Sequence, residues 1–168
     1  NMKRAIAISN ENFIVTNGTD EDLAQYFAIG NETMIISDDF DKLSQNDIYQ
    51  IMCAGRKEEY EKILQGTKNA KIAAWWDKAV DIIPANSGKG NAVSAVLKYY
   101  GFSKEEAIAF GDGQNDIEML EAVGTGVAMG NAKDEVKERA DAVCKSVEED
   151  GVYYYCLENK LITEIDEP

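Results

Sequence analysis

The sequence predicts an α/β protein with a parallel sheet in its C-terminal half and a separate α+β module before it. After Pro84, the single proline inside the chain, apolar runs of strand length alternate with segments of helical periodicity. Such alternation is typical of a parallel sheet with helices on its faces. Before Pro84, short apolar runs follow one another closely, as in an α+β module. We therefore expect a partial module at residues 1–83 and half of an α/β core at residues 84–168.

The elements expected in the module are three strands and one helix. The strands are residues 48–54, 71–76 and 79–83, and a short amphipathic helix is residues 57–65. Only Asp77 and Lys78 separate the last two strands, which predicts a tight turn. Trp75 and Trp76 are neighbours in the second strand, where adjacent side chains point to opposite sides. One indole is therefore predicted to be in the core, while the other is free to line a cleft.

The alternation after Pro84 begins and ends with a helix. We expect helices at residues 91–100, 116–122, 134–139 and from about residue 151, and strands at residues 107–110, 126–129 and 142–144. The apolar run 108–110 is short and is followed by Gly111, as expected of a strand buried on both faces. The residues directly after it therefore lie at the carboxyl end of the sheet, where open α/β sheets bind ligands.

Composition limits the partners and the chemistry. The 168 residues include 31 acidic and 17 basic side chains, a formal charge of −14 with no cluster of Lys or Arg, which argues against nucleic acid or an anionic membrane as the partner. The three cysteines form no CxxC pair, so a reduced, cytoplasmic setting is expected. The chain has no histidine, which leaves carboxylates and lysine as acid, base and metal chemistry, and an oxygen-bound hard cation as the expected metal.

The stretch GDGQND, residues 111–116, carries the strongest sign of a site. Asp112 directly follows the apolar strand, between two glycines that permit close backbone approach. Asp116 falls in the first turn of the next helix, where the helix dipole favours a carboxylate. Either aspartate alone is explained as a turn or cap residue, but together after a buried strand they predict a cation site.

Lys89 predicts an anion contact. It lies in SGKG, just before a predicted helix, where backbone N–H groups and the positive end of the helix dipole attract an anion and a lysine adds a full charge. Without the GDGQND stretch, a solvated lysine in a glycine turn would explain it as well.

The segment FGDGQNDIEMLEAVGTGVAMGNAKDEVKERADAV, together with DIIPANSGKGNAVSAVLKYYGFSKEEAIA before it and EDGVYYYCLENKLI after it, resembles the C-terminal half of Cof-type phosphatases of the haloacid dehalogenase (HAD) superfamily. The resemblance covers about residues 71–162. It implies a HAD-like, Rossmann-like core, a mobile α+β cap, and magnesium-dependent hydrolysis of small phosphorylated metabolites through a phospho-aspartate.

The resemblance also assigns roles to single residues. Asp112 would be a magnesium ligand and Asp116 its supporting carboxylate. Lys89 would contact the phosphate, while Asn115 and Gly113 would face the substrate.

One family motif is missing from these residues. The family's DxDGT motif, which supplies the nucleophile and the acid/base, does not occur in the sequence, and 83 residues before Pro84 are too few for the first core strands plus a complete cap. The chain is therefore expected to be a truncated or internally deleted member.

Two alignments of the N-terminus remain open. Residues 2–9 could be a degenerate first core strand, which would put Ser9 at the nucleophile position and Glu11 at the acid/base position. Alternatively, residues 5–15 belong to the third core strand or to the first strand of the cap. A serine hydroxyl, unlike a carboxylate, must lose a proton before it attacks phosphorus, so Ser9 could not simply substitute.

Three functional hypotheses follow from these patterns. The first is a Cof-type phosphatase that is impaired or inactive, with weak or lost Mg²⁺ binding. The second is a pseudophosphatase that binds a phosphorylated metabolite without hydrolysing it, and the third is a folded gene remnant. Because missing strands would leave sheet edges unpaired, a homodimer is also expected.

Overall fold

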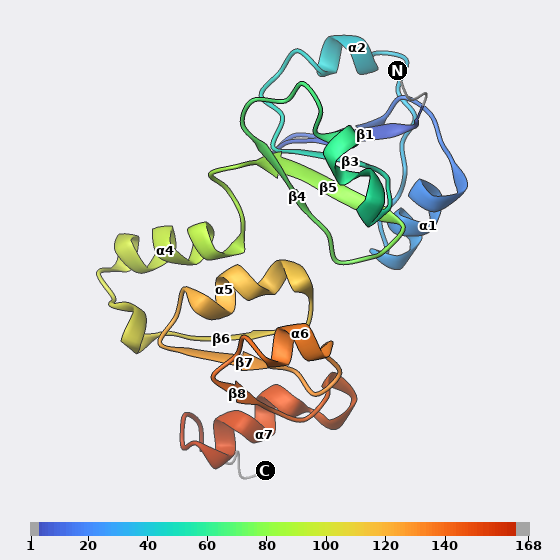
Figure 1. Cartoon of the computed structure of the whole chain (residues 1–168). Coiled ribbons are helices and arrows are strands. Elements are labelled where there is room, and N and C mark those ends of the chain that lie inside the picture. Colours follow the sequence, from blue (N-terminus) through green and yellow to red (C-terminus); the bar gives the residue numbers. More distant parts are fainter. Residues whose placement is uncertain (1–3, 164–168) are drawn as a thin grey trace, which may run out of the picture. The chain divides into compact units, whose positions relative to one another are not determined.

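The computed structural model describes residues 4–163 and divides the chain into two compact units, Asn1–Asn86 and Ser87–Pro168 (Figure 1). The division falls close to Pro84, where the sequence pattern changes. None of the helices within residues 4–163 is long and apolar enough to cross a membrane.

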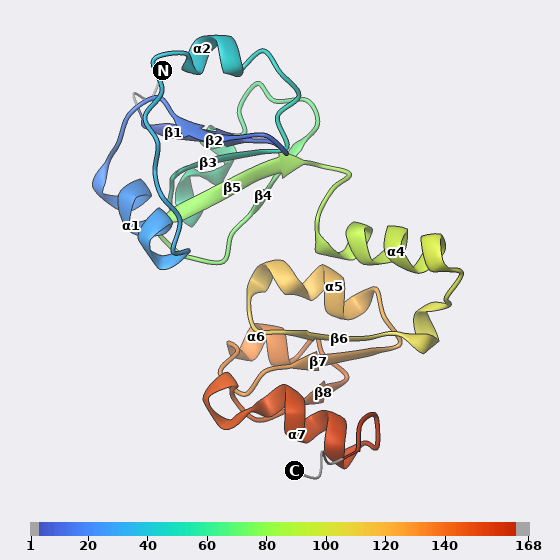
Figure 2. The same ribbon diagram turned by 180° about the vertical axis from the view of Figure 1, so that it is seen from behind.

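The first unit contains a five-stranded antiparallel sheet (Figure 2). Its strand order is β2-β1-β3-β5-β4, with β1 at Ile6–Ser9, β2 at Ile14–Thr16, β3 at Gln50–Ala54, β4 at Ala70–Ala73 and β5 at Ala79–Pro84. The pairing of β4 with β5 confirms the predicted hairpin, with Ala73 opposite Asp81, but residues 74–78, and not a tight turn of Asp77 and Lys78, connect the two strands. β3 confirms the predicted strand at residues 48–54, although it begins two residues later.

The sheet corrects one of the two N-terminal alignments. β1 pairs antiparallel with β2 and with β3. An Asx turn at Asn10, whose side-chain oxygen accepts the N–H groups of Asn12 and Phe13, reverses the chain between β1 and β2. Ser9 and Glu11 therefore belong to an antiparallel hairpin, and a degenerate first strand of the parallel sheet at residues 2–9 is wrong. Residues 2 and 3 of that prediction lie outside the described residues.

Helix α1, Glu21–Ile29, covers one face of this sheet. Asp20 caps it by accepting the N–H of Leu23 at 2.9 Å, and Leu23 and Phe27, one turn apart, pack against Ala7 and Met52. On the other face, Phe40 of α2, Phe40–Leu43, packs against Ile8 and Val15. Alternate residues of β1 therefore serve two separate apolar clusters.

The predicted helix at residues 57–65 is a short 3₁₀ turn, Lys57–Glu59, followed by α3, Tyr60–Ile63. The prediction for the two tryptophans is wrong, because β4 ends at Ala73 and both indoles lie in the loop that leads to β5. Instead of facing opposite sides, the rings of Trp75 and Trp76 stack with centroids 6.5 Å apart and an interplanar angle of 27°.

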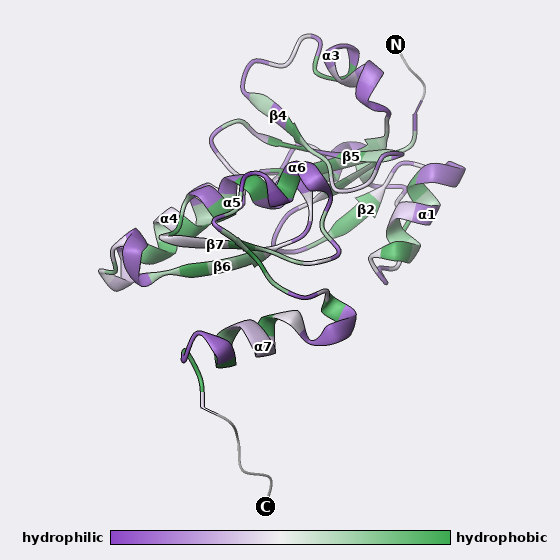
Figure 3. Ribbon diagram, turned by 60° about the horizontal axis from the view of Figure 1, so that its bottom comes forward, coloured by the Kyte–Doolittle hydropathy of each residue, from purple (hydrophilic) through white to green (hydrophobic). Residues whose placement is uncertain are grey.

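The second unit confirms the predicted alternation of helix and strand. Its sheet is parallel, in the order β6-β7-β8, with β6 at Ile108–Gly111, β7 at Thr125–Ala128 and β8 at Ala142–Val143. Its helices are α4 at Lys89–Tyr100, α5 at Ile117–Glu121, α6 at Asp134–Lys137 and α7 at Gly151–Glu158. α4, α5 and α6 lie on one side of this sheet and α7 lies on the other (Figures 1 and 3).

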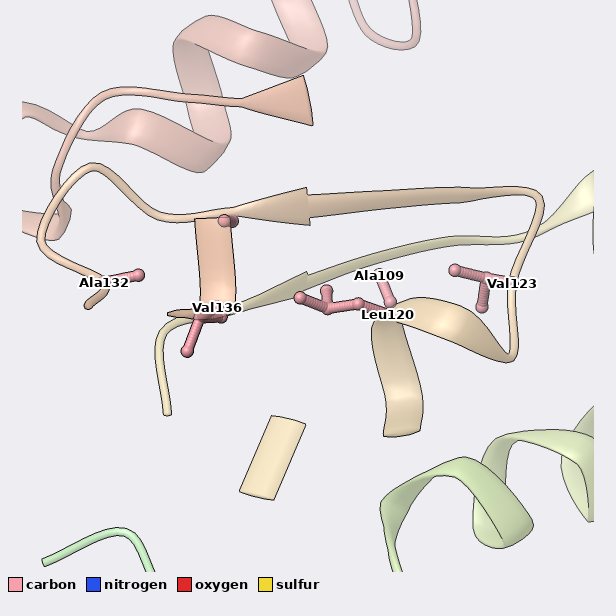
Figure 4. Close-up of a cluster of buried hydrophobic side chains, with 6 residues drawn as sticks. Ala109, Leu120, Val123, Ala132 and Val136 are labelled. Atoms are coloured by element: carbon pink, nitrogen blue, oxygen red, sulfur yellow. The ribbon is translucent and has the colours of Figure 1, made fainter. Parts of the chain in front are cut away.

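A cluster of small and branched side chains joins α5 and α6 to the sheet (Figure 4). It consists of Ala109, Leu120, Val123, Ala128, Ala132 and Val136. α4 packs closely on α5, since a Cβ added at Gly90 would lie 2.4 Å from the carbonyl oxygen of Glu118. This contact fixes the first turn of α4, where Lys89 lies.

Candidate functional site

The site is built around the loop that follows β6. Asp116, in the 3₁₀ turn Gln114–Asp116, is only 5% exposed. Its Oδ2 accepts the N–H groups of Asp112 at 3.1 Å and Gly113 at 3.0 Å. A Cβ at Gly111 would lie 2.6 Å from the Cβ of Asp116, so a glycine is required for the carboxylate to fold back over the loop. Asp116 therefore fixes the course of the chain around Asp112.

The second oxygen of Asp116 holds Lys89. The Lys89 ammonium forms an ion pair with Oδ1, while the lysine side chain remains 50% exposed. An ammonium group has three hydrogens, so this pairing orients the group and leaves donors for a ligand. The structure thus brings together Lys89 and Asp116, two of the candidate site residues.

Asp112 has the opposite environment. It is exposed, and its Oδ2 accepts a hydrogen bond from Nδ2 of Asn131 at 2.8 Å. The Oδ1 of Asn131 in turn accepts the N–H of Val147 at 3.0 Å. The Asp112 carboxylate is therefore oriented through a single oxygen.

These contacts can be tested against the needs of Mg²⁺. Magnesium in proteins keeps several waters and is usually held by one or two carboxylates plus phosphate oxygens. Within residues 4–163, no three His, Cys, Asp or Glu side chains form a metal-binding group. Both oxygens of Asp116 are already engaged, which leaves Asp112 as the exposed carboxylate. The residues fit a magnesium ion that is bound through Asp112, water and a phosphate.

The remaining predicted residues divide between the two units. Asn115 and Gly113 belong to the Asp112 loop, and a Cβ at Gly113 would lie 2.4 Å from Oδ1 of Asn115, so this side chain folds over the loop. Ser9 and Glu11 lie at the β1–β2 hairpin of the other unit. There the Tyr49 hydroxyl, by hydrogen bonding, lowers the pKa of Glu11.

Sequence reasoning missed Asn131. It follows β7 in the stretch Met129-Gly130-Asn131, and β7 is the parallel neighbour of β6. Polar residues that follow adjacent parallel strands meet at the same sheet edge, so this position could have been inferred from the same rule that singled out Asp112.

The family model of the haloacid dehalogenase-like hydrolases matches residues 1–156. The chain belongs to this family. Its α/β fold, with one parallel and one antiparallel sheet, is that of the family's subclass IIB: it matches the structure of the subclass IIB sugar phosphatase BT4131 with a TM-score of 0.85 at 26% identity, over 95% of this chain and 62% of that one.

Two curated relatives are more similar in sequence. The pyridoxal phosphate phosphatase YbhA of Escherichia coli (strain K12) is 42% identical over 102 residues, which are 60% of this chain and 35% of that protein. The 5-amino-6-(5-phospho-D-ribitylamino)uracil phosphatase YwtE of Bacillus subtilis (strain 168) is 36% identical over 114 residues, 65% of this chain and 40% of that protein. The chain thus spans less than half the length of either relative.

Proposed function

We propose that this chain binds small phosphate monoesters together with Mg²⁺ at the carboxyl end of β6. The observation that carries the proposal is the double use of Asp116, whose buried carboxylate holds both the Lys89 ammonium and the backbone around Asp112. The two groups left exposed have opposite charge. The ammonium suits a phosphate oxygen and the Asp112 carboxylate suits a hard cation.

Each residue of the site would have a separate role in ligand binding. Lys89 would donate to a phosphoryl oxygen and orient the ester, while Asp112 would hold the magnesium ion, which when bound would neutralise charge on the phosphate. Asp116 would hold the Lys89 ammonium in position, and Asn131 would orient Asp112. Asn115 and Gly113 are proposed to border the ligand.

We propose further that the 168-residue chain by itself binds such esters without efficient hydrolysis. Hydrolysis in this family is expected to need an ionised carboxylate as nucleophile, and the sequence DxDGT does not occur in these residues. Ser9 lies in an antiparallel hairpin, and a serine hydroxyl would need a base to become nucleophilic. Such a chain would belong to a phosphatase family but would bind phosphate esters without hydrolysing them efficiently.

The names of the relatives suggest the organic part of the ester. Pyridoxal phosphate and the ribitylaminouracil phosphate each join a nitrogen heterocycle to a phosphate. We infer that this chain binds a phosphorylated metabolite of the same general kind.

Isothermal titration calorimetry with ribose 5-phosphate, with and without Mg²⁺, tests the phosphate site. Lys89→Ala should weaken binding at least tenfold, because a charge-assisted hydrogen bond is worth about 1.5–3 kcal/mol. Lys98→Ala is the matched control, since Lys98 lies in the last turn of the same helix. Asp112→Asn should remove the part of the affinity that depends on magnesium. Equal affinity of the Lys89 and Lys98 variants would refute the site.

A further inference from the structure

An aromatic pair in the first unit is not used by the phosphate site. Trp75 and Trp76, in the loop between β4 and β5, stack on each other, and Trp75 is 36% exposed. The ring of Tyr26, from α1, packs against Trp75 with centroids 5.0 Å apart. The Lys78 ammonium lies over the Trp76 ring, 5.5 Å from its centroid. The three rings therefore form a partly exposed aromatic surface with a cation at one end.

A chain of hydrogen bonds anchors this surface to the sheet. The indole N–H of Trp75 donates to the Tyr26 hydroxyl at 3.1 Å, and that hydroxyl donates to Oδ1 of Asp81 at 2.6 Å. Asp81 lies on β5 and is 8% exposed. Burial raises the pKa of the Asp81 carboxyl, which means that the ionised carboxylate is destabilised at this position. The hydrogen bond from the Tyr26 hydroxyl partly offsets this free-energy cost.

The other end of the loop is held independently. The carbonyl oxygen of Lys78 accepts the N–H of Gly55 at 2.9 Å and Nη1 of Arg56 at 2.7 Å. Nη2 of Arg56 donates to Asp22 at 2.7 Å, and Asp22 lies one turn before Tyr26 on α1. Both ends of the loop are thus tied to the same helix, which keeps the two indoles in a fixed geometry.

We propose that Trp75 and Trp76 form a binding surface for a planar nitrogen heterocycle, with Tyr26 as the residue that positions Trp75. Stacking on an aromatic face suits any flat ring, because every such ring offers a π face. Trp75 is held by the Tyr26 hydroxyl, which is anchored on the buried Asp81, and its indole remains 36% exposed, so part of the ring is open to a ligand. The choice of a heterocycle over other rings rests on the proposed function.

The chain offers a direct readout of this surface. Trp75 and Trp76 are its two tryptophans, so tryptophan fluorescence reports on this loop and on nothing else. Uridine is a suitable probe, because it carries a planar heterocycle, lacks phosphate and scarcely absorbs at the red edge of the tryptophan band, where the indoles are excited. Ribose 5-phosphate carries the phosphate without the ring, and glucose tests a sugar in place of a planar ring.

Uridine should quench the fluorescence saturably, whereas ribose 5-phosphate and glucose should not. Trp75→Ala, followed by calorimetry, should weaken uridine binding roughly 5- to 150-fold, the equivalent of about 1–3 kcal/mol per stacked base. Tyr26→Phe keeps the ring but removes both hydrogen bonds. It should lower the steady-state anisotropy of Trp75 in a Trp76→Phe background and weaken uridine binding, while Tyr60→Phe, in α3, should do neither.

The two sites can fail separately. Loss of ribose 5-phosphate binding in Lys89→Ala tests the phosphate site alone, since that ligand has no base. Three results would overturn the aromatic surface: no quenching by uridine, equal quenching by glucose, or uridine binding that survives Trp75→Ala in a protein whose circular dichroism and melting temperature match the wild type. Tight glucose binding with weak uridine binding would assign the surface to sugars and would also reject the proposal.

Discussion

The two aspartates of the loop that follows β6 should respond differently to replacement by asparagine. Asp116→Asn should lower the stability of the protein, whereas Asp112→Asn should leave the stability nearly unchanged and weaken the binding of Mg²⁺. Asp116→Asn places an amide N–H₂ against the Lys89 ammonium or against two backbone N–H groups, so one set of donors loses its acceptor. Removing one partner of a buried ion pair costs about 3–5 kcal/mol. Lys89 is half exposed and can turn toward water, which reduces this loss, and we expect Asp116→Asn to cost about 2 kcal/mol.

Asp112→Asn should behave differently. Asp112 is exposed and accepts one hydrogen bond, from Asn131, which an asparagine oxygen can also accept. Exposed substitutions of this kind change stability by less than about 0.5 kcal/mol. The variant should nevertheless lose the stabilisation that millimolar Mg²⁺ gives the wild type, because it removes the negative charge that would hold the cation.

Urea unfolding followed by far-ultraviolet circular dichroism measures both effects. Tryptophan fluorescence cannot replace it, because Trp75 and Trp76 both lie in the first unit. Asp134→Asn is the matched control, since Asp134 is an exposed aspartate in the first turn of α6. The assigned roles would be refuted if Asp116→Asn were as stable as the Asp134 variant, or if Asp112→Asn were the less stable of the two loop variants.

Three further predictions concern other parts of the chain. Asn131→Ala should weaken magnesium-dependent binding of ribose 5-phosphate several-fold in calorimetry while Lys98→Ala leaves it unchanged, since Asn131 orients Asp112; equal effects would contradict this. Burial raises the pKa of Asp81 above its ordinary value of 3.8, so the folded state holds the proton more tightly. The wild type should therefore lose stability relative to Asp81→Asn as the pH rises from 3.8 through the raised pKa. A wild-type unfolding free energy that stayed constant or rose with pH, relative to that of Asp81→Asn, would reject this. Among the described residues β6 is an edge strand, on which Ile108 is 37% exposed, so light scattering should find a dimer or larger species, and a mass of about 18.6 kDa at micromolar concentration would rule out the self-association.

The second unit could be predicted from the sequence because its signals are local. Each apolar run and each helical segment after Pro84 lies within a residue or two of its predicted position. A parallel strand reads as an uninterrupted apolar run, and glycines mark its end, although β6 is not buried on both faces as predicted, since Ile108 is exposed. Asp112 and Asp116 could be found for the same reason, since their place relative to β6 depends only on chain order.

The first unit was harder to predict because its pairing is not local. β1 and β3 are separated by residues 10–49, and an apolar run such as residues 5–8 fits a parallel or an antiparallel neighbour equally well. α1 was missed, although Asp20 followed by Leu23 and Phe27 carries a cap and an apolar spacing. The tryptophans were misplaced because a hydrogen bond to Tyr26, far away in sequence, holds Trp75 in a loop where strand propensity predicts a strand.

The roles within the site also depended on contacts that the sequence does not contain. Both aspartates were predicted to serve the metal, but the contacts of Asp116 with Lys89 and with two backbone amides could not be read from the sequence. Asn131 was missed because its link to Asp112 crosses between two strand ends.

Phosphorus-31 NMR of ribose 5-phosphate with Mg²⁺ and the 168-residue chain tests the central claim most directly, because one spectrum reports binding and hydrolysis together. We predict that the ester signal broadens in the presence of the wild type or Lys98→Ala. With Lys89→Ala it should remain as narrow as the signal of the free ester, and no inorganic phosphate should accumulate. An ester signal unaffected by the wild-type chain would contradict the binding site, and release of inorganic phosphate that disappears in Asp112→Asn would show that the chain hydrolyses the ester after all.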